Sequence, residues 1–301
     1  MINFPNKKID IPCCLINIAI YLALSAPTLS FAEVVLVNQP LSAQDQRYDY
    51  PHRLLSAILK ITEPQYGITS IEQSRLKMSR ARTLKEMQKG VNIHVFAEAT
   101  TPLWEDKLIP IRIPIRKGIQ GYRVFLILAK NQAMLSNIKT VEQLKSIPTG
   151  SGTQWISTKI LEKNDFNIVL GNNYNGLFSM LFKERFITFM RGINESEDEY
   201  NIYKVKCPEL RIEKDLLLYT VLPTYFFVTP AKPELAKRIE AGLQMMISDG
   251  SFDKMFNDEF AQHIKSANLA GRRLFVINNP DLTPQTPLNI KTYWYHPSSQ
   301  P

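Results

Sequence analysis

The chain has 301 residues, of which 45% are hydrophobic and 21% are charged, and its formal net charge is +8. This composition is that of a globular protein with one large or two medium domains, and it excludes a low-complexity or repeat-built chain. The basic residues are spread between apolar positions and form no block, so we expect no nucleic-acid partner despite the positive charge.

The first 32 residues predict a cleavable signal peptide. Lys7 and Lys8 precede an apolar run over Ile11–Leu24, which is shorter than a comfortable membrane span. Small residues two positions apart end the segment at Ala32, so we expect cleavage between Ala32 and Glu33 and a periplasmic location. A buried N-terminal segment and a retained membrane anchor are the alternatives.

Cysteine and histidine usage after this cut argues against disulfides and metals. Cys207 is then the only cysteine, so no intramolecular disulfide is expected. The few histidines lie far apart in the sequence and no two have the spacing of metal ligands. We therefore expect neither a metal site nor a cofactor.

From residue 33 to residue 96 the sequence alternates between strand and helix patterns. Short β-branched runs predict strands, and apolar residues three or four positions apart predict helices. The expected strands are Glu33–Asn38, Ser70–Gln73 and Val91–Phe96, and the expected helices are Leu54–Ile61 and Ser79–Gly90. This order is typical of a parallel sheet with covering helices.

A strongly apolar strand over Gly121–Ala129 opens a second α/β block, which runs to about residue 218. Turn-forming residues over Pro148–Thr153 predict a loop inside this block. The expected helices are Val141–Lys145, Gln154–Lys163, Asn175–Lys183 and Glu195–Tyr200, and the expected strands are Ile168–Leu170 and Ile187–Met190.

A second long apolar run, Leu216–Val228, precedes two helices near the end of the chain. The first is amphipathic and spans Pro233–Ser248, and the second is short and spans Ser251–Phe256. Five prolines follow Asn278 and predict an extended strap. Two α/β blocks joined by two long apolar strands indicate a discontinuous architecture.

Segments that carry a family resemblance lie in one order across most of the chain after residue 33. They are Ser79–Phe96, Glu98–Pro102, Thr140–Lys145 with Gly152–Thr153, Pro223–Phe227, Pro233–Ala236 and Ser248–Phe252. In this order they resemble the type II periplasmic solute-binding proteins, in particular the polar amino-acid-binding components of transporters.

The resemblance implies an α/β fold of two lobes, each a mostly parallel sheet with flanking helices, joined by two crossover strands. It places a signal peptide at 1–32, a discontinuous first lobe at 33–124 and 220–301, and a second lobe at 125–219. The crossover strands are expected near Gly121–Ala129 and Leu218–Val228 and would form the hinge between lobes that move as rigid bodies.

In the first lobe, Thr100 and Thr101 follow an expected strand. Ligands of open α/β sheets bind outside the carboxyl ends of strands, so we expect both hydroxyls to contact the ligand, with loop capping as the alternative. Three residues after Thr101 stands Trp104, where the family usually has an arginine that binds the ligand's carboxylate. Trp104, Tyr50 and Tyr225 are candidate apolar walls of the pocket, with ordinary core packing as the alternative.

In the second lobe, Ser151, Gly152 and Thr153 precede an expected helix. The free N–H groups at a helix start favour an anion, and Gly152 permits close approach of a ligand. An ordinary helix cap is the alternative. Arg191 follows an expected strand and would hold a carboxylate in two-point geometry, with a surface pair to a nearby glutamate, Glu195 or Glu197, as the alternative.

These features predict a protein that binds a small, anionic or zwitterionic solute in an interlobe cleft for transport, and that is not an enzyme. One alternative is a ligand-sensing module for a separate membrane signalling protein. The other is a dehydratase-like enzyme on the same fold, for which Glu98 or Glu195 would act as acid or base. The expected partners are the solute and a membrane permease or sensor kinase, and we expect a monomer.

Overall fold

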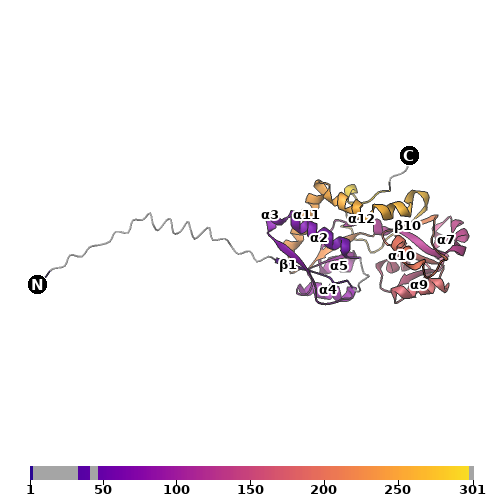
Figure 1. The fold of residues 1–301 in the computed structure, drawn as a ribbon, viewed down its shortest axis with the longest axis horizontal. Helices are drawn as coiled ribbons and strands as arrows, with labels where there is room; N and C mark the ends of the chain where they lie inside the picture. The colour runs from indigo at the N-terminus through magenta and orange to yellow at the C-terminus, as the bar shows by residue number, and fades with distance from the viewer. Residues whose placement is uncertain (3–32, 41–46, 298–301) are drawn as a thin grey trace.

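A computed structural model describes residues 1–2, 33–40 and 47–297 of the chain. They form two lobes, each built on its own sheet and covered by helices (Figure 1). Apart from its first two residues, the predicted signal peptide lies outside the described residues, and so does the predicted cleavage site. Within the described ranges, no helix is both long enough and apolar enough to cross a membrane.

The first lobe contains a five-stranded sheet in the order β2-β1-β3-β11-β4. Its strands are β1 Glu33–Val37, β2 Thr69–Gln73, β3 Val95–Ala99, β4 Ile109–Ile111 and β11 Thr224–Val228. The first three pair in parallel, as expected, although β3 begins four residues later than predicted. β11 runs antiparallel to both of its neighbours and lies between β3 and β4.

Helices cover both faces of this sheet. They are α2 Asp49–Ile61, α3 Glu63–Tyr66, α4 Arg80–Lys89, α5 Pro102–Lys107, α11 Pro233–Ser248 and α12 Ser251–Ala267. The apolar stripe of α2 is buried as its spacing predicts. The predicted short helix from Ser251 to Phe256 continues to Ala267, because Phe260 extends the buried face by another turn.

The second lobe contains a seven-stranded sheet in the order β12-β10-β5-β8-β6-β7, with β9 also paired to β5. Its strands are β5 Tyr122–Leu128, β6 Thr149–Gly152, β7 Ile168–Gly171, β8 Thr188–Gly192, β9 Leu210–Ile212, β10 Leu216–Tyr219 and β12 Arg273–Val276. Its helices are α6 Gln132–Ser136, α7 Val141–Ser146, α8 Ile156–Glu162, α9 Tyr174–Phe182 and α10 Ser196–Tyr203.

The predicted loop over Pro148–Thr153 is the main local error. Residues 149–152 form β6, a fully buried strand between β7 and β8. Gly150 lies against Phe186, since a Cβ on it would come within 2.2 Å of the ring, so the glycine that suggested a turn instead permits close packing. The following helix accordingly begins at Ile156 and not at Gln154.

Two segments connect the sheets: residues 112–121, between β4 and β5, and residues 220–223, between β10 and β11. We call them the first and second linkers. The predicted crossover strand Gly121–Ala129 therefore does not itself cross between the lobes. It follows the first linker, and all seven residues of β5 are buried inside the second sheet. Strands next to the linkers run against their neighbours, so both sheets are mixed and not mostly parallel.

The chain crosses between the lobes a third time, from α12 to β12 through residues 268–272. β12 pairs in parallel with β10, so residues 273–276 belong to the second sheet, although the predicted division put them in the first lobe. The predicted boundaries at residues 124 and 219 stay a prediction about independently moving units.

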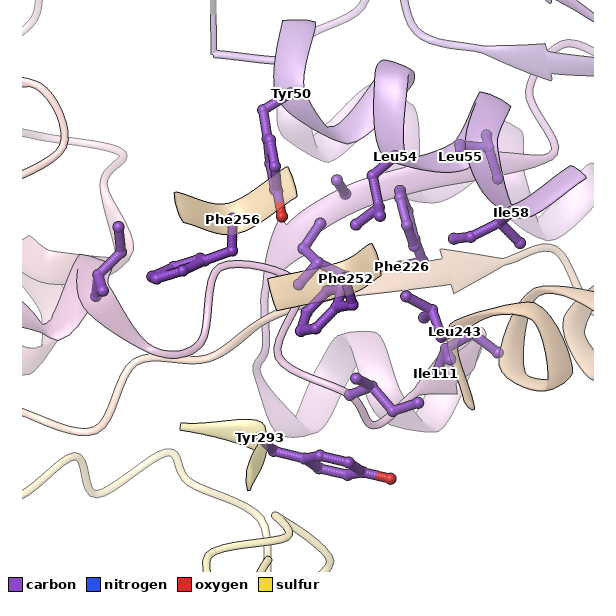
Figure 2. Close-up of a cluster of buried hydrophobic side chains, with 14 of the residues drawn as sticks. Tyr50, Leu54, Leu55, Ile58, Ile111, Phe226, Leu243, Phe252, Phe256 and Tyr293 are labelled. Carbon is purple, nitrogen blue, oxygen red and sulfur yellow. The ribbon is translucent and has the colours of Figure 1, made fainter. Parts of the chain in front are cut away.

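One apolar cluster extends across both lobes. It contains the buried faces of α2, α11 and α12 together with Val124 and Leu217 of the second sheet. Figure 2 shows part of this cluster, in which Phe252 and Phe256 of α12 lie among side chains of α2 and β11. Because α12 packs against α11 of the first lobe and also contacts α10 of the second, where Nε2 of His263 lies 3.1 Å from Oδ2 of Asp198, it joins the lobes as well as covering the first one.

Candidate functional site

Arg191, the predicted carboxylate-binding residue, lies at the carboxyl end of β8 and is only 5% exposed. Its Nε and Nη2 donate to the two carboxylate oxygens of Glu199, both at 2.6 Å, and Nη2 also lies 3.0 Å from Oε2 of Glu195. The face of the guanidinium is covered by the rings of Trp155, at 4.7 Å, and Tyr174, at 5.6 Å. Arg191 is thus paired with nearby glutamates, as in the alternative given above, but these ion pairs are buried and do not lie on the surface.

Burial and pairing shift the two carboxyl groups in opposite directions. Burial raises the pKa of Glu199 despite its contact with Arg191. Burial would also raise the pKa of Glu195, but the guanidinium groups of Arg191 and Arg123 outweigh it and lower that pKa. Glu195 is therefore held as a carboxylate between two arginines.

Arg123 and Asn194 extend this cluster and carry polar atoms that no described residue satisfies. Arg123 lies opposite Gly192 in the β5–β8 register, and its Nη1 lies 3.3 Å from Oε1 of Glu195. The Nε of Arg123 and the Oδ1 of Asn194 are buried without a hydrogen-bond partner among the described residues. Both side chains lie over Gly192, where an added Cβ would come within 2.7 Å of the Asn194 oxygen and 3.4 Å of Arg123 Nη1.

Arg116, in the first linker, places a further positive charge between the lobes. It is 8% exposed, and its Nη2 donates to the carbonyl of Arg47. Burial lowers the pKa of Arg116, while tyrosine side chains of the first lobe, Glu195 of the second lobe and Glu98 of β3 oppose this shift. The carboxyl ends of β3 and β8 therefore bring charges of both lobes within electrostatic range of one arginine.

The residues predicted to contact the ligand in the first lobe are hydrogen-bonded or packed within that lobe. Thr100 is fully buried, and its hydroxyl donates to Oε1 of Glu105 at 2.5 Å. Thr101 caps α5, and its hydroxyl accepts from the N–H of Trp104. Trp104 is 1% exposed and packs between aromatic rings of β3 and β11, with the guanidinium of Arg80 over its face. These contacts are those of the capping and packing alternatives, and ligand contact by these residues stays a prediction.

The predicted second-lobe loop is brought next to Arg191 through Trp155. A Cβ on Gly152 would come within 2.4 Å of the Trp155 ring, which in turn covers Arg191. The hydroxyl of Ser151 is buried against that of Thr158, and the hydroxyl of Thr153 donates to Asn172 at 2.6 Å. Gly152 thus allows the indole to lie close to the backbone and over the cluster.

The two remaining candidates, Tyr50 and Tyr225, are core residues. Tyr50 is 2% exposed and makes an edge contact with the ring of Phe260, and Tyr225 is fully buried near Phe227. Burial raises the pKa of both tyrosines. As with Trp104, both side chains are packed in the core, and their predicted role as pocket walls stays a prediction. In the part of the chain that the structure describes, no group of acidic, cysteine and histidine side chains has the geometry of a metal site.

Sequence reasoning missed Arg123, Asn194 and the pairing with Glu199. An arginine inside the apolar run GYRVFLILA was a usable signal, since a charge in a buried strand needs a partner or a function. No comparable signal marked Asn194 or Glu199, because neither belongs to a motif.

Comparisons with known proteins identify the fold. No model of a known protein family matches the sequence, and no curated protein sequence matches it either. Solved structures do match. An ancestral arginine-binding protein bound to arginine is similar to this chain with a TM-score of 0.55 and 17% identity, over 75% of this chain and 98% of the other. The chain has the type II periplasmic binding protein fold.

Two further structures agree on this fold. An ancestral amino-acid-binding protein, described as a precursor of cyclohexadienyl dehydratase, matches with a TM-score of 0.53 and 15% identity, over 75% of this chain and 95% of the other. A Salmonella typhimurium periplasmic binding protein with high arginine specificity matches with a TM-score of 0.51 and 11% identity, over 76% of this chain and all of the other. The predicted two-lobed binding-protein fold is confirmed.

Proposed function

We propose that this protein binds a small zwitterionic or anionic solute between its two lobes, at the carboxyl ends of β3 and β8, and delivers it to a membrane permease from the periplasm. The observation that carries the proposal is the incomplete pairing of the Arg191 cluster. A buried guanidinium donor on Arg123 and a buried carbonyl acceptor on Asn194 lack partners among the described residues and lie over the same glycine. Most buried polar groups in proteins have a hydrogen-bond partner, so a donor and an acceptor that are both unpaired over one glycine are candidate ligand contacts.

The chemistry of these two atoms suggests the ligand class. A free N–H donor on an arginine suits a carboxylate, and an amide oxygen beside the Glu195 carboxylate suits an ammonium group. A molecule that carries both groups on neighbouring atoms, such as an amino acid, satisfies both partners at once. Arg191 was predicted to bind the carboxylate itself, but Glu199 takes its Nε and Nη2, so we assign the ligand contact first to Arg123.

Native mass spectrometry of protein isolated from the periplasm, followed by calorimetric titration with amino acids and dicarboxylates, tests the proposal. Arg123→Met should weaken binding by about 10- to 150-fold, the range for one charge-assisted hydrogen bond. Arg191→Ala and Arg191→Lys measure the contribution of Arg191 separately. Arg185→Met replaces an exposed arginine just before β8 and should leave affinity unchanged.

Two outcomes would contradict this assignment. Protein that carries no small molecule and binds none of the panel is not a solute-binding protein of this class. If Arg123→Met and Arg185→Met bind the solute equally well, solute binding stands but its site lies elsewhere.

A further inference from the structure

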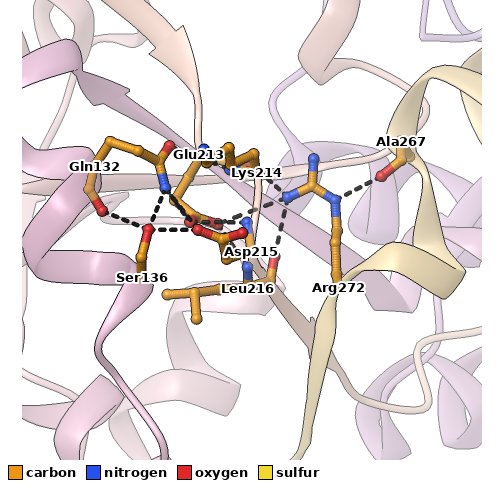
Figure 3. A network of polar contacts seen from close by, with 8 residues as sticks. All are labelled: Gln132, Ser136, Glu213, Lys214, Asp215, Leu216, Ala267 and Arg272. Carbon is orange, nitrogen blue, oxygen red and sulfur yellow. Dashed lines mark hydrogen bonds and ion pairs between the residues drawn. The ribbon is translucent and has the colours of Figure 1, made fainter.

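The C-terminal segment, residues 277–297, runs back from the second lobe to the first after β12. We call it the strap. It leaves β12 at Ile277, whose N–H donates to the carbonyl of Tyr219, and the other end of β12 is preceded by Arg272, which donates to three backbone carbonyls (Figure 3). Its Nε donates to the carbonyl of Ala267 at 2.6 Å, and its Nη1 donates to the carbonyls of Glu213 and Leu216. The strap therefore leaves the second sheet with a defined direction.

The first part of the strap is attached to the second lobe and to the second linker. Nδ2 of Asn164 donates to the carbonyl of Asn278 at 2.9 Å, and Nζ of Lys163 lies 2.6 Å from Oδ1 of Asp281. Between these contacts, Nδ2 of Asn279 donates to the carbonyl of Val221 at 2.9 Å. Val221 lies within the second linker, so this bond ties the strap to the backbone of a connection between the lobes.

The middle of the strap is attached to the first lobe. The hydroxyl of Thr283 donates at 3.0 Å to Oε1 of Glu105, the same oxygen that accepts from Thr100 at the end of β3. Further along, the hydroxyl of Tyr293 accepts from Nε2 of Gln244 in α11 at 2.6 Å.

The last part of the strap covers the first linker. The ring of Trp294 lies directly on Gly118, since a Cβ there would come within 2.6 Å of the indole. Gly118 has a φ of +72°, a conformation that a side chain would strain, so the linker bends at this residue beneath the indole. The N–H of Tyr295 donates to the carbonyl of Lys117 at 2.7 Å. The two linkers are also bonded to each other, from the N–H of Thr220 to the carbonyl of Gly121.

We propose that the strap is a brace on the hinge. It holds both linkers and both lobes at one interlobe angle. The contact of Trp294 with Gly118 or that of Asn279 with Val221 must break before the lobes can rotate. Hinge rotation is absorbed by backbone dihedral changes in a few linker residues, and Lys117, Gly118 and Val221 are the linker residues that carry the strap. This proposal does not depend on the identity of the solute or on the proposed function.

Hydrogen exchange of the ligand-free protein, followed by mass spectrometry, tests the brace. The reporters are the amides of Gly121 and Thr220, which are hydrogen-bonded within and between the linkers. Trp294→Ala and Asn279→Ala should each speed exchange at these amides by about tenfold or more, because local opening follows the loss of buried contacts. Amides of the buried strand β5 should exchange as in the wild type. The control is Leu288→Ala, since Leu288 is a strap residue that is 52% exposed.

Small-angle scattering on the same variants reports the angle between the lobes. The brace predicts a shifted or broader distribution of dimensions for Trp294→Ala and Asn279→Ala and none for Leu288→Ala. If the linker amides and the scattering of both variants match the wild type while strap amides exchange faster, the strap only covers the surface and the proposal is wrong. If Trp294→Ala exposes β5 as well, it has unfolded, and Asn279→Ala together with Trp294→Phe decides the question.

Discussion

Two buried charge clusters of the second lobe differ in how completely their polar atoms are paired. Around Glu213, which is fully buried, both carboxylate oxygens accept: one from Gln132 and the N–H of Asp215, the other from the N–H of Leu216 (Figure 3). Around Arg191, by contrast, the glutamates are paired, but Arg123 and Asn194 keep buried atoms without a partner among the described residues. A fully paired network fixes the backbone, whereas an incompletely paired one leaves room for another molecule's polar groups.

The largest expected effect is on the paired network. Arg272→Met leaves the carboxylate of Glu213 buried with its nearest cation removed, and it frees three carbonyls. We expect the free energy of unfolding to fall by about 3–5 kcal/mol, the usual cost of breaking a buried pair from one side. Urea unfolding measures this, with Lys265→Met, an exposed residue at the end of α12, as the control. A loss no greater than that of the control would show that the network does not hold the crossing.

A smaller effect is expected when the incompletely paired cluster loses Arg123. Arg123→Met removes the unpaired Nε together with the Nη1 contact to Glu195, and Glu195 keeps Arg191 and the N–H of Gly192. Because Glu195 keeps a second arginine, losing this one charged contact should lower the free energy of unfolding by about 1.5–3 kcal/mol, less than the loss of Arg272. A loss as large as that of Arg272→Met in the same urea titration would show that the two clusters stabilise the fold equally, whether or not their polar atoms are all paired.

The smallest effect is expected in the first lobe, where a histidine is fully paired in only one protonation state. Nδ1 of His94 accepts from the N–H of Leu36 at 3.1 Å, which requires the neutral ring, and burial lowers the pKa of His94 from 6.5. A folded-state pKa below the unfolded value means that this contribution is fully present above pH 6.5 and is lost as the pH falls through the folded-state pKa.

Between pH 7 and pH 5, the wild type should therefore lose about 1 kcal/mol more unfolding free energy than His94→Gln, about the value of one hydrogen bond. His296→Gln, at an exposed position near the C-terminus, should keep the pH dependence of the wild type. Identical pH profiles for the wild type and His94→Gln would show that protonation of this ring does not disturb β1.

The sequence predicted those parts of the fold in which one local pattern decides the structure. The apolar stripe of α2, the closure of α4 at Gly90 and the amphipathic face of α11 each follow from spacing and a terminal residue. β6 was missed because its glycines are typical of a turn, and only the structure places the ring of Phe186 against Gly150. A local pattern does not contain that partner, which lies more than thirty positions away.

The candidate site was predicted less well for the same reason. Arg191 was recognised from its place after a strand, but its main partner, Glu199, lies on a helix whose orientation only the tertiary structure sets. Thr100 was expected at the ligand from its place after a strand, and Trp104 was expected as an apolar wall. In the structure their partners are Glu105 and an aromatic cluster, and ligand contact by either residue stays a prediction. Hydroxyl and indole groups serve equally well in a cap, a core and a pocket, so residue type alone did not separate these roles.

The position of β11 sets an order for folding. It lies between β3 and β4 in the interior of the first sheet, yet it is contributed by residues 224–228, after most of the second lobe. A chain that is synthesised from its N-terminus cannot complete the first sheet until residue 228 has been made. The strands β5 to β10 of the second sheet, by contrast, follow one another in the sequence. The N-terminal strands therefore keep an unpaired, apolar edge while the middle of the protein folds. During this interval we expect the chain to aggregate most readily.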